Sequence, residues 1–241
     1  MKLVRDYGDE MRILETHIRE QVHDDKPLQI LEAGCGREWY VKLDGVKFEL
    51  TGLDIDEAAL EIRKSVKRDM NHSFLGDLRT AELPPGYFDV VYNAYVLEHI
   101  KGAQAALQNF VTWLKPGGLM ILRVPDRDSV QGLLARITPH WFHVFYYRWA
   151  WKMKDAGKPG FPPYPVVYDP VVSRRGLESF CTSHGLDVVD VLGVGTFRRG
   201  YGLAGRITPL VAAVVSALTL GIVHAKFVDL TVIARKRAQL V

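Results

Sequence analysis

The feature that most constrains the fold is a regular alternation of apolar runs with helix-like segments. The apolar runs in the first half of the chain are residues 28–34, 48–56, 73–78, 87–95 and 119–126. Helix-forming segments lie between some of them, at 57–67 and 103–114. Strands that alternate with helices form a parallel sheet covered on both faces. The pattern therefore predicts an α/β fold whose ligands bind outside the carboxyl ends of the strands.

The second half of the chain completes this sheet. We expect a helix at 173–185 and strands at 186–195 and 227–236, because apolar residues recur there with the matching periods. An amphipathic lead-in helix is expected at 8–23. The whole chain, 1–241, is then one domain.

Two insertions interrupt the predicted core, which covers 26–126, 173–195 and 227–237. Residues 127–172 are rich in aromatic residues and proline, and residues 196–226 contain a long uncharged apolar run. The first insertion is too apolar for a linker. We expect both insertions to form a helical and aromatic cap over the strand ends.

Composition excludes several classes of protein. Of 241 residues, 48% are hydrophobic and 24% are charged, which is typical of a globular chain and not of a disordered one. A net charge of +3 is too small to predict nucleic-acid binding. The two cysteines, Cys35 and Cys181, cannot build a disulfide framework or a Cys-rich zinc site, and we expect no metal site. A cytoplasmic location is expected.

Three strand ends carry residues suited to a nucleoside-containing ligand. Gly34 and Gly36 follow the first strand and allow a sharp turn with close ligand approach. Asp54 ends the next strand about 20 residues later, where a ribose hydroxyl pair would lie. Asp77, beside Leu78 at the third strand end, can accept an adenine amino group. The alternative role for an acidic residue at the second strand end is to cap the helix that follows, and Asp56 fits that role better than Asp54.

With these motifs the chain resembles the class I S-adenosylmethionine-dependent methyltransferases, in particular those that methylate small molecules. The resemblance rests on LEAGCG (31–36), GLDID (52–56), FLGDL (74–78), FDVVYNAYVLEHI (88–100), LKPGG (114–118) with LMILRVP (119–125), and FVDLTVIARK (227–236). It implies a Rossmann-like sheet of seven strands, mostly parallel, with an antiparallel last strand.

The resemblance also implies roles for individual residues, with S-adenosylmethionine as cofactor. Glu32, Gly34 and Gly36 would hold its methionine end, and Asn93 would lie beneath this portion. Asp54 would bind the ribose hydroxyls. The residues that would pack on or frame the adenine are Ile55, Asp77 and Leu78.

One position departs from the family. The usual third glycine of the loop is replaced by Glu38, and the connection to the second strand leaves room for about one helical turn. Trp39 and Tyr40 are expected to compensate for the shortened helix.

Methyl transfer chiefly needs alignment of a nucleophile, which a general base can assist. The candidate bases are His99, after the fourth strand, and His140 and His143, in the aromatic insertion. Packing of each histidine against aromatic rings is the alternative. The run 141–151 can form the cap core, a pocket for a flat apolar acceptor, or both.

The apolar segment 207–223 has three interpretations. It can be a helix buried in the cap and starting at Pro209, a contact of a homodimer, or a peripheral membrane contact. It is shorter than the roughly 20 residues that span a bilayer. Burial is the interpretation that we favour.

The hypothesis is therefore transfer of a methyl group to a small acceptor, aromatic or lipid-like, most simply a hydroxyl. An NAD-dependent oxidoreductase is an alternative, but Trp39 stands where G-x-G-x-x-G requires its last glycine. A non-catalytic or membrane-associated module that binds the cofactor is the other alternative.

Overall fold

Eight strands form one sheet in the computed structural model, which describes residues 1–158, 161–167, 169–195, 203–220 and 223–238. The order is β1-β7-β8-β6-β5-β2-β3-β4. The strands are β1 (Lys2–Val4), β2 (Leu28–Ala33), β3 (Phe48–Asp54), β4 (His72–Leu75), β5 (Phe88–Ala94), β6 (Leu114–Pro125), β7 (Leu186–Val194) and β8 (Asp229–Lys236). β8 runs antiparallel to β6 and β7, and the other neighbouring pairs are parallel. The predicted α/β sheet with an antiparallel last strand is confirmed.

The sheet has one strand more than the seven expected. β1 pairs in parallel with β7, with Lys2 opposite Leu192 and Val4 opposite Val194. A strand of three residues has no periodicity of its own, so only its pairing with β7 reveals it.

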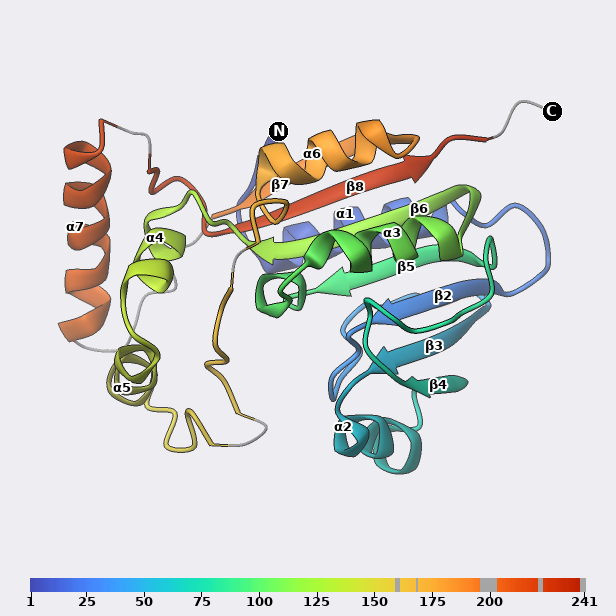
Figure 1. Cartoon of the computed structure of the whole chain (residues 1–241), viewed down its shortest axis with the longest axis horizontal. Helices are drawn as coiled ribbons and strands as arrows, with labels where there is room; N and C mark the ends of the chain where they lie inside the picture. The colour runs from blue at the N-terminus through green and yellow to red at the C-terminus, as the bar shows by residue number, and fades with distance from the viewer. Residues whose placement is uncertain (159–160, 168, 196–202, 221–222, 239–241) are drawn as a thin grey trace.

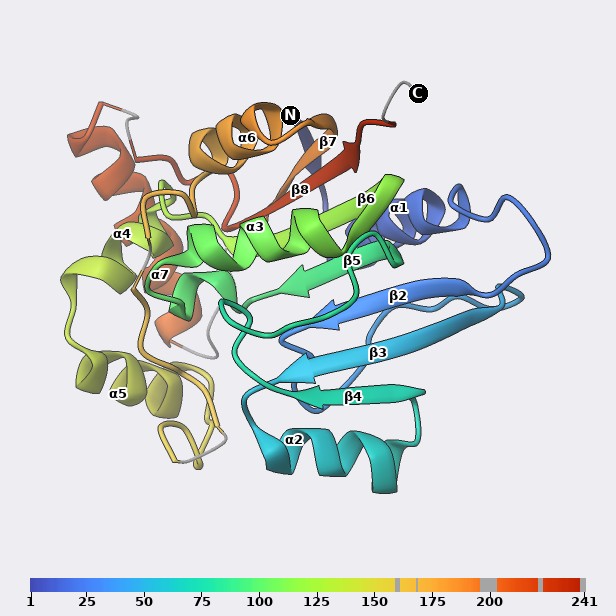
Figure 2. The same cartoon turned by 45° about the vertical axis from the view of Figure 1, so that its right-hand side comes forward.

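Helices cover both faces of the sheet. The helices are α1 (Tyr7–Arg19), α2 (Glu57–Glu61) continued by the π-helix η1 (Ile62–Lys67), the 3-10 helix η2 (Leu97–His99), α3 (Ala103–Trp113), α4 (Val130–Ile137), α5 (His140–Ala150), α6 (Arg174–Ser183) and α7 (Leu203–Leu218). α3 and α6 pack on one face through Phe110 and Phe180, and α1 packs on the other through Leu14 and Ile18 (Figures 1 and 2). The Asp56 cap is confirmed, because its carboxylate accepts hydrogen bonds from the N–H groups of Ala58 and Ala59.

The connection between β2 and β3 contains no helix, not even the single turn expected. Val41 and Leu43 are buried against the α1 face of the sheet, and the Trp39 ring meets Tyr92 edge-on with centroids 5.4 Å apart. These side chains supply the apolar cover that a helix would otherwise give. Tyr40 is exposed and contributes none of it, so only Trp39 compensates as expected.

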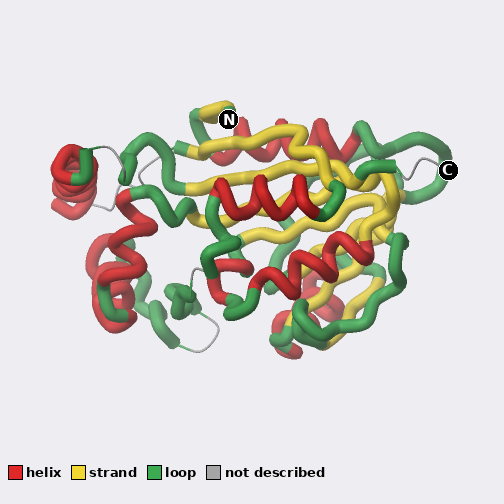
Figure 3. The backbone as a smooth tube through the Cα atoms, turned by 45° about the horizontal axis from the view of Figure 1, so that its top comes forward, coloured by secondary structure: helices red, strands yellow, loops and turns green. Residues whose placement is uncertain are grey.

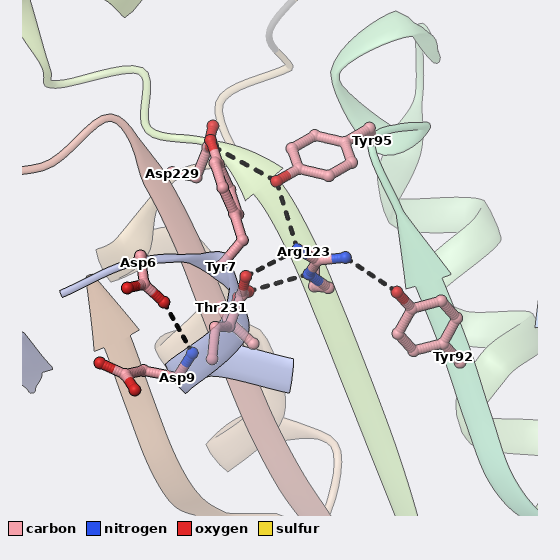
Figure 4. Close-up of polar contacts among 9 residues, drawn as sticks. Asp6, Tyr7, Asp9, Tyr92, Tyr95, Arg123, Asp229 and Thr231 are labelled. Carbon is pink, nitrogen blue, oxygen red and sulfur yellow. Dashed lines mark hydrogen bonds and ion pairs between the residues drawn. The ribbon is translucent and has the colours of Figure 1, made fainter. Parts of the chain in front are cut away.

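A buried polar network ties α1 to the sheet (Figure 4). Arg123 of β6 donates to both carboxylate oxygens of Glu10 at 2.8 and 2.6 Å, and to the Tyr92 hydroxyl at 3.0 Å. Thr231 of β8 also donates to Glu10, whose side chain is fully buried. The planar guanidinium thus fixes one helix against two strands through charge-assisted hydrogen bonds.

The two insertions form a cap at the end of the molecule toward which the parallel strands point (Figures 1 and 3). They meet where Ser129 and His224 form a parallel β-bridge. The His224 Nε2 atom also lies 2.8 Å from Asp126 Oδ2, at the end of the core. α4 and α5 belong to the first insertion, and α7 belongs to the second and packs on α4.

The structure corrects the favoured interpretation of the segment 207–223, of which residues 221–222 lie outside the described residues. α7 begins at Leu203, ahead of the expected start at Pro209. Ala212 is buried, but Leu210, Val214 and Leu218 are exposed, the last by 79%. The helix therefore packs on the cap along one side only. Within the described part of the chain, no helix has the length and apolar character needed to cross a membrane.

Candidate functional site

The turn after β2 is built from two glycines with left-handed backbone conformations. Gly34 has φ 77°, and a Cβ atom there would lie 2.5 Å from Val96 Cγ2. Gly36 has φ 52°, and a Cβ there would meet no atom within 4 Å. Glycine is therefore required at Gly34 by conformation and by space. The turn at Gly36 faces open space, into which a ligand can approach.

Asp54, at the end of β3, shapes this turn. Its Oδ2 atom accepts a hydrogen bond from the Gly36 N–H at 2.8 Å, and its Oδ1 atom accepts one from the Asp56 N–H at 2.9 Å. Each carboxylate oxygen has a second lone pair. The side chain is half-buried, so it can accept further donors such as hydroxyl groups.

Arg63 supports the same turn from beneath, a role that the sequence analysis missed. Its side chain is fully buried, and its Nη1 atom donates to the carbonyl oxygen of Cys35 at 2.9 Å. Its other nitrogens lie 2.9 Å from Glu32 Oε2 and 2.6 Å from Asp69 Oδ1. A signal did exist in the sequence, because Arg63 follows the buried Ala59 and Leu60 at helical spacing. A cation on an apolar helix face requires buried anionic partners.

Glu32 is accordingly engaged within the protein. Burial raises its pKa to about 8, while the nearby Arg63 guanidinium opposes the rise. Glu32 is therefore a buried partner of Arg63, which supports the turn.

Asn93, at the end of β5, carries an unused acceptor. The side chain is fully buried, and its Nδ2 atom donates to the carbonyl oxygen of Ala33 at 2.6 Å. Its Oδ1 atom has no hydrogen-bond partner among the described residues. Buried amide oxygens are normally satisfied, so this atom is available to a ligand donor.

The ends of β3 and β4 lie side by side, where the sequence places the adenine. The Gly76 N–H donates to the Asp54 carbonyl oxygen at 2.9 Å. Ile55 is 74% exposed, whereas Leu78 is buried in the core. The Asp77 carboxylate accepts hydrogen bonds from the Arg79 side chain, which lowers the pKa of Asp77.

Of the three candidate bases, His99 lies beside the strand ends. Its Nδ1 atom is 2.7 Å from the Pro165 carbonyl oxygen, and its ring meets Tyr164 edge-on at 5.9 Å between centroids. Burial lowers its pKa. A carbonyl oxygen can only accept, so Nδ1 carries the proton and Nε2 is left as an acceptor in neutral His99.

The other two histidines stay within the cap. His143 Nε2 lies 2.7 Å from the Thr138 hydroxyl, and the His140 and His143 rings are 6.2 Å apart. Among the described residues, no hydrogen bond or ring contact joins either of them to the glycine turn or to Asp54.

Glu98, adjacent to His99, was also missed. Its side chain is buried, and its Oε2 atom has no hydrogen-bond partner among the described residues. Burial raises its pKa to about 8, and the negative charge of Asp229 adds to the rise. Glu98 Oε1 lies 3.7 Å from His99 Nε2. Glu98, whose pKa is raised, and His99, whose pKa is lowered, thus lie next to each other after the end of β5.

Comparisons with known proteins show the family of the chain. Residues 9–191 match a family model described as a methyltransferase domain. A ubiquinone biosynthesis O-methyltransferase of Colwellia psychrerythraea is 30% identical over 198 residues, which cover 76% of this chain and 73% of that protein. A demethylmenaquinone methyltransferase of Staphylococcus haemolyticus is 28% identical over 119 residues, which cover 47% of this chain and 50% of that protein.

Several of these matches are partial: the chain spans half or less of the length of the first curated relatives that it matches. A solved structure of a SAM-dependent methyltransferase from Methanosarcina mazei superposes with a TM-score of 0.57 at 14% identity, covering 92% of this chain and 98% of that one. At this identity the superposition shows the fold alone.

The cofactor of these enzymes fits the residues present. S-adenosylmethionine offers an ammonium group and ribose hydroxyls as donors, and an adenine ring with apolar faces. The chain offers the unused Asn93 Oδ1, the remaining lone pairs of Asp54, the open side of Gly36 and the exposed Ile55. The protein belongs to the family defined by this methyltransferase domain.

Proposed function

We propose that the cofactor lies across the carboxyl ends of β2, β3 and β5. Gly34, Gly36 and Asn93 would hold its methionine end, with Glu32 acting through the turn. Asp54 would bind the ribose hydroxyls. Ile55, Asp77 and Leu78 would line the adenine, with Leu78 contributing from the core. The observation that carries this proposal is the Asp54 carboxylate, which braces the open glycine turn and keeps unused lone pairs.

We infer that the acceptor is a small molecule with a hydroxyl group. The cap next to the strand ends has the aromatic composition expected around a flat or apolar acceptor. The Colwellia relative, whose name describes an O-methyltransferase, matches over 73% of its length and supports a hydroxyl. When bound, the cofactor supplies a methyl group activated by its sulfonium. The chain has to position the acceptor and remove a proton.

His99 is the residue that we propose for this proton transfer. Its Nδ1–H donates to Pro165, which fixes the ring and leaves Nε2 free to accept the proton of the hydroxyl. Burial lowers the pKa of His99, which favours the neutral imidazole. The buried Glu98 beside it is protonated at neutral pH, because burial raises its pKa, so no carboxylate charge there raises the pKa of the imidazole. His140 and His143 remain candidates only if the acceptor extends into the cap.

The test is a methyl-transfer assay with labelled S-adenosylmethionine and a panel of matched phenols, anilines and aliphatic alcohols. We expect labelled ethers from the hydroxyl compounds. His99→Gln should lower kcat by about 10²-fold or more while leaving cofactor binding intact. His143→Gln serves as the matched control and should change kcat little. Methylation of amines alone, or equal losses for the two variants, would contradict the proposal.

A further inference from the structure

Helix α5 presents a stripe of aromatic side chains to solvent. Trp141, Phe145 and Trp149 recur every four residues and therefore share one helix face. All three are exposed, Trp141 by 69%, and the adjacent Phe142 is exposed as well. The rings of Phe145 and Trp149 lie almost parallel, with centroids 6.5 Å apart. Side chains of this size are rarely left in water without a binding role when they are grouped.

Helix α7 carries a second stripe. Ile207, Val211, Val214 and Leu218 have the spacing of a single helix face, and all four are exposed. The buried Ala212 and the half-buried Val215 belong to the side that packs toward the cap. Both helices lie at the same end of the molecule, beyond the strand ends (Figures 1 and 2).

The stretches of sequence that carry the two stripes contain basic residues and no acidic ones. No aspartate or glutamate occurs between Asp128 and Asp155, or between Asp190 and Asp229, although the chain contains 28 of them. The first run contains four lysines and arginines, Arg136, Arg148, Lys152 and Lys154, and all four are exposed. In the second run, Lys226 follows α7 and is exposed. Of the two acidic residues that bound the first run, Asp155 is neutralised by Lys158 at 2.6 Å.

We propose that this end of the cap, formed by α5 and α7, docks on the surface of an anionic lipid bilayer. Exposed tryptophans suit the boundary between headgroups and acyl chains, and lysines and arginines at the rim attract anionic headgroups. A second copy of the chain is a poorer occupant, because a symmetric contact would bring the basic rim of one copy against that of the other. Neither helix crosses the bilayer, and both lie on it.

The docked face adjoins the strand ends, so a lipid-like acceptor could reach the catalytic site directly from the bilayer. The docking itself does not depend on the proposed reaction. Binding to vesicles is measured without cofactor or acceptor, so failure of one proposal leaves the other intact.

The test is flotation of the full chain with vesicles of phosphatidylcholine alone and of phosphatidylcholine with 30% phosphatidylglycerol. We expect binding to the anionic vesicles, weakened by 0.5 M NaCl, with a blue shift of tryptophan fluorescence. Leu218→Ser and Lys152→Glu should each reduce the bound fraction at least threefold. The matched controls are Val66→Ser, nearly as exposed as Leu218 but on η1, and Lys47→Glu, just before β3. Both controls should bind as the wild type does.

Circular dichroism and gel filtration of each variant accompany the flotation. No binding of the folded wild type to either vesicle would overturn the proposal, and so would equal losses in the controls. A dimer that Leu218→Ser converts to a monomer, with no vesicle binding, would overturn it in favour of a second copy.

Discussion

The Asp54 carboxylate accepts a hydrogen bond from the backbone N–H of Gly36 at 2.8 Å, which joins the end of β3 to the turn after β2. The same carboxylate also holds the Asp56 N–H, just before α2. One acidic side chain therefore shapes the turn and the start of the next helix. The turn needs this support because no helix follows β2, and because Glu38 occupies the position of the third glycine.

Glu38 is accommodated by pairing away from the turn. Its carboxylate accepts a hydrogen bond from Lys67 of η1 at 2.5 Å and another from the Tyr40 hydroxyl at 2.9 Å. The replacement therefore adds a link between the loop and η1, and leaves Gly36 with its open side.

Replacing Gly34 tests the geometry of the turn. Gly34→Ala should lower the free energy of unfolding by about 2–5 kcal/mol, because the left-handed backbone costs about 1–2 kcal/mol and a Cβ would collide with Val96. Gly45→Ala has nearly the same φ but no neighbouring atoms, so it should cost only about 1–2 kcal/mol. Urea denaturation measures both. Val96→Ala should recover part of the loss in Gly34→Ala but none in Gly45→Ala, and equal losses in the two glycine variants would contradict the clash.

Arg63 tests the buried support of the turn. Arg63→Met leaves Glu32 and Asp69 without their cation, and removal of one partner from a buried pair costs about 3–5 kcal/mol. The double variant Arg63→Met/Glu32→Gln should differ little in stability from Arg63→Met at pH 6, where burial keeps Glu32 protonated, and should be the more stable of the two at pH 9. Arg79→Met, which breaks a pair on the surface, is the control and should cost less than about 1 kcal/mol. If Arg63→Met lowered the free energy of unfolding by no more than Arg79→Met does, the buried pair would not support the turn.

Glu98 predicts a dependence of stability on pH. The pKa of Glu98 is about 8 in the folded protein, against 4.5 for an ordinary glutamate side chain, so the folded state binds more protons between these two values. The contribution of Glu98 to the stability of the fold is fully present below pH 4.5 and is lost as pH rises through 8. Between pH 6 and 8 the wild type should lose at least about 1 kcal/mol of stability relative to Glu98→Gln. Denaturation midpoints across this range measure the difference.

A comparison of Glu82→Gln with the wild type checks that prediction, because Glu82 is exposed. The difference in the free energy of unfolding between Glu82→Gln and the wild type should stay constant with pH. A constant difference for Glu98→Gln as well would mean that Glu98 is not held in its protonated form.

The strands, and the positions of the candidate site residues at their ends, could be predicted because their signals are local. An apolar run that stops at a glycine or an acid marks both a buried strand and its ligand-facing end, as at Gly34 and Asp54. The cap of α2 at Asp56 is local as well. β1 could not be predicted, since it exists only through its pairing with β7.

The buried charges could not be placed for a related reason. Glu10 and Arg123 are 113 residues apart and pair only in the folded chain, and Arg63 meets Glu32 from another element. The error at α7 has a different cause. An apolar helix is equally compatible with a buried and an exposed position, and nothing in residues 207–223 specifies which neighbours cover it.

The central claim is that Asp54 and the glycine turn bind S-adenosylmethionine, and calorimetric titration tests it most directly. S-adenosylmethionine and S-adenosylhomocysteine should both bind the wild type, while NADH should not. Asp54→Ala should weaken binding of both by about 10-fold or more, since it removes the hydroxyl acceptor and the brace on Gly36. Asp44→Ala, in the exposed loop before β3, should bind as the wild type does. Unchanged affinity in folded Asp54→Ala, or no binding by the wild type, would contradict the account.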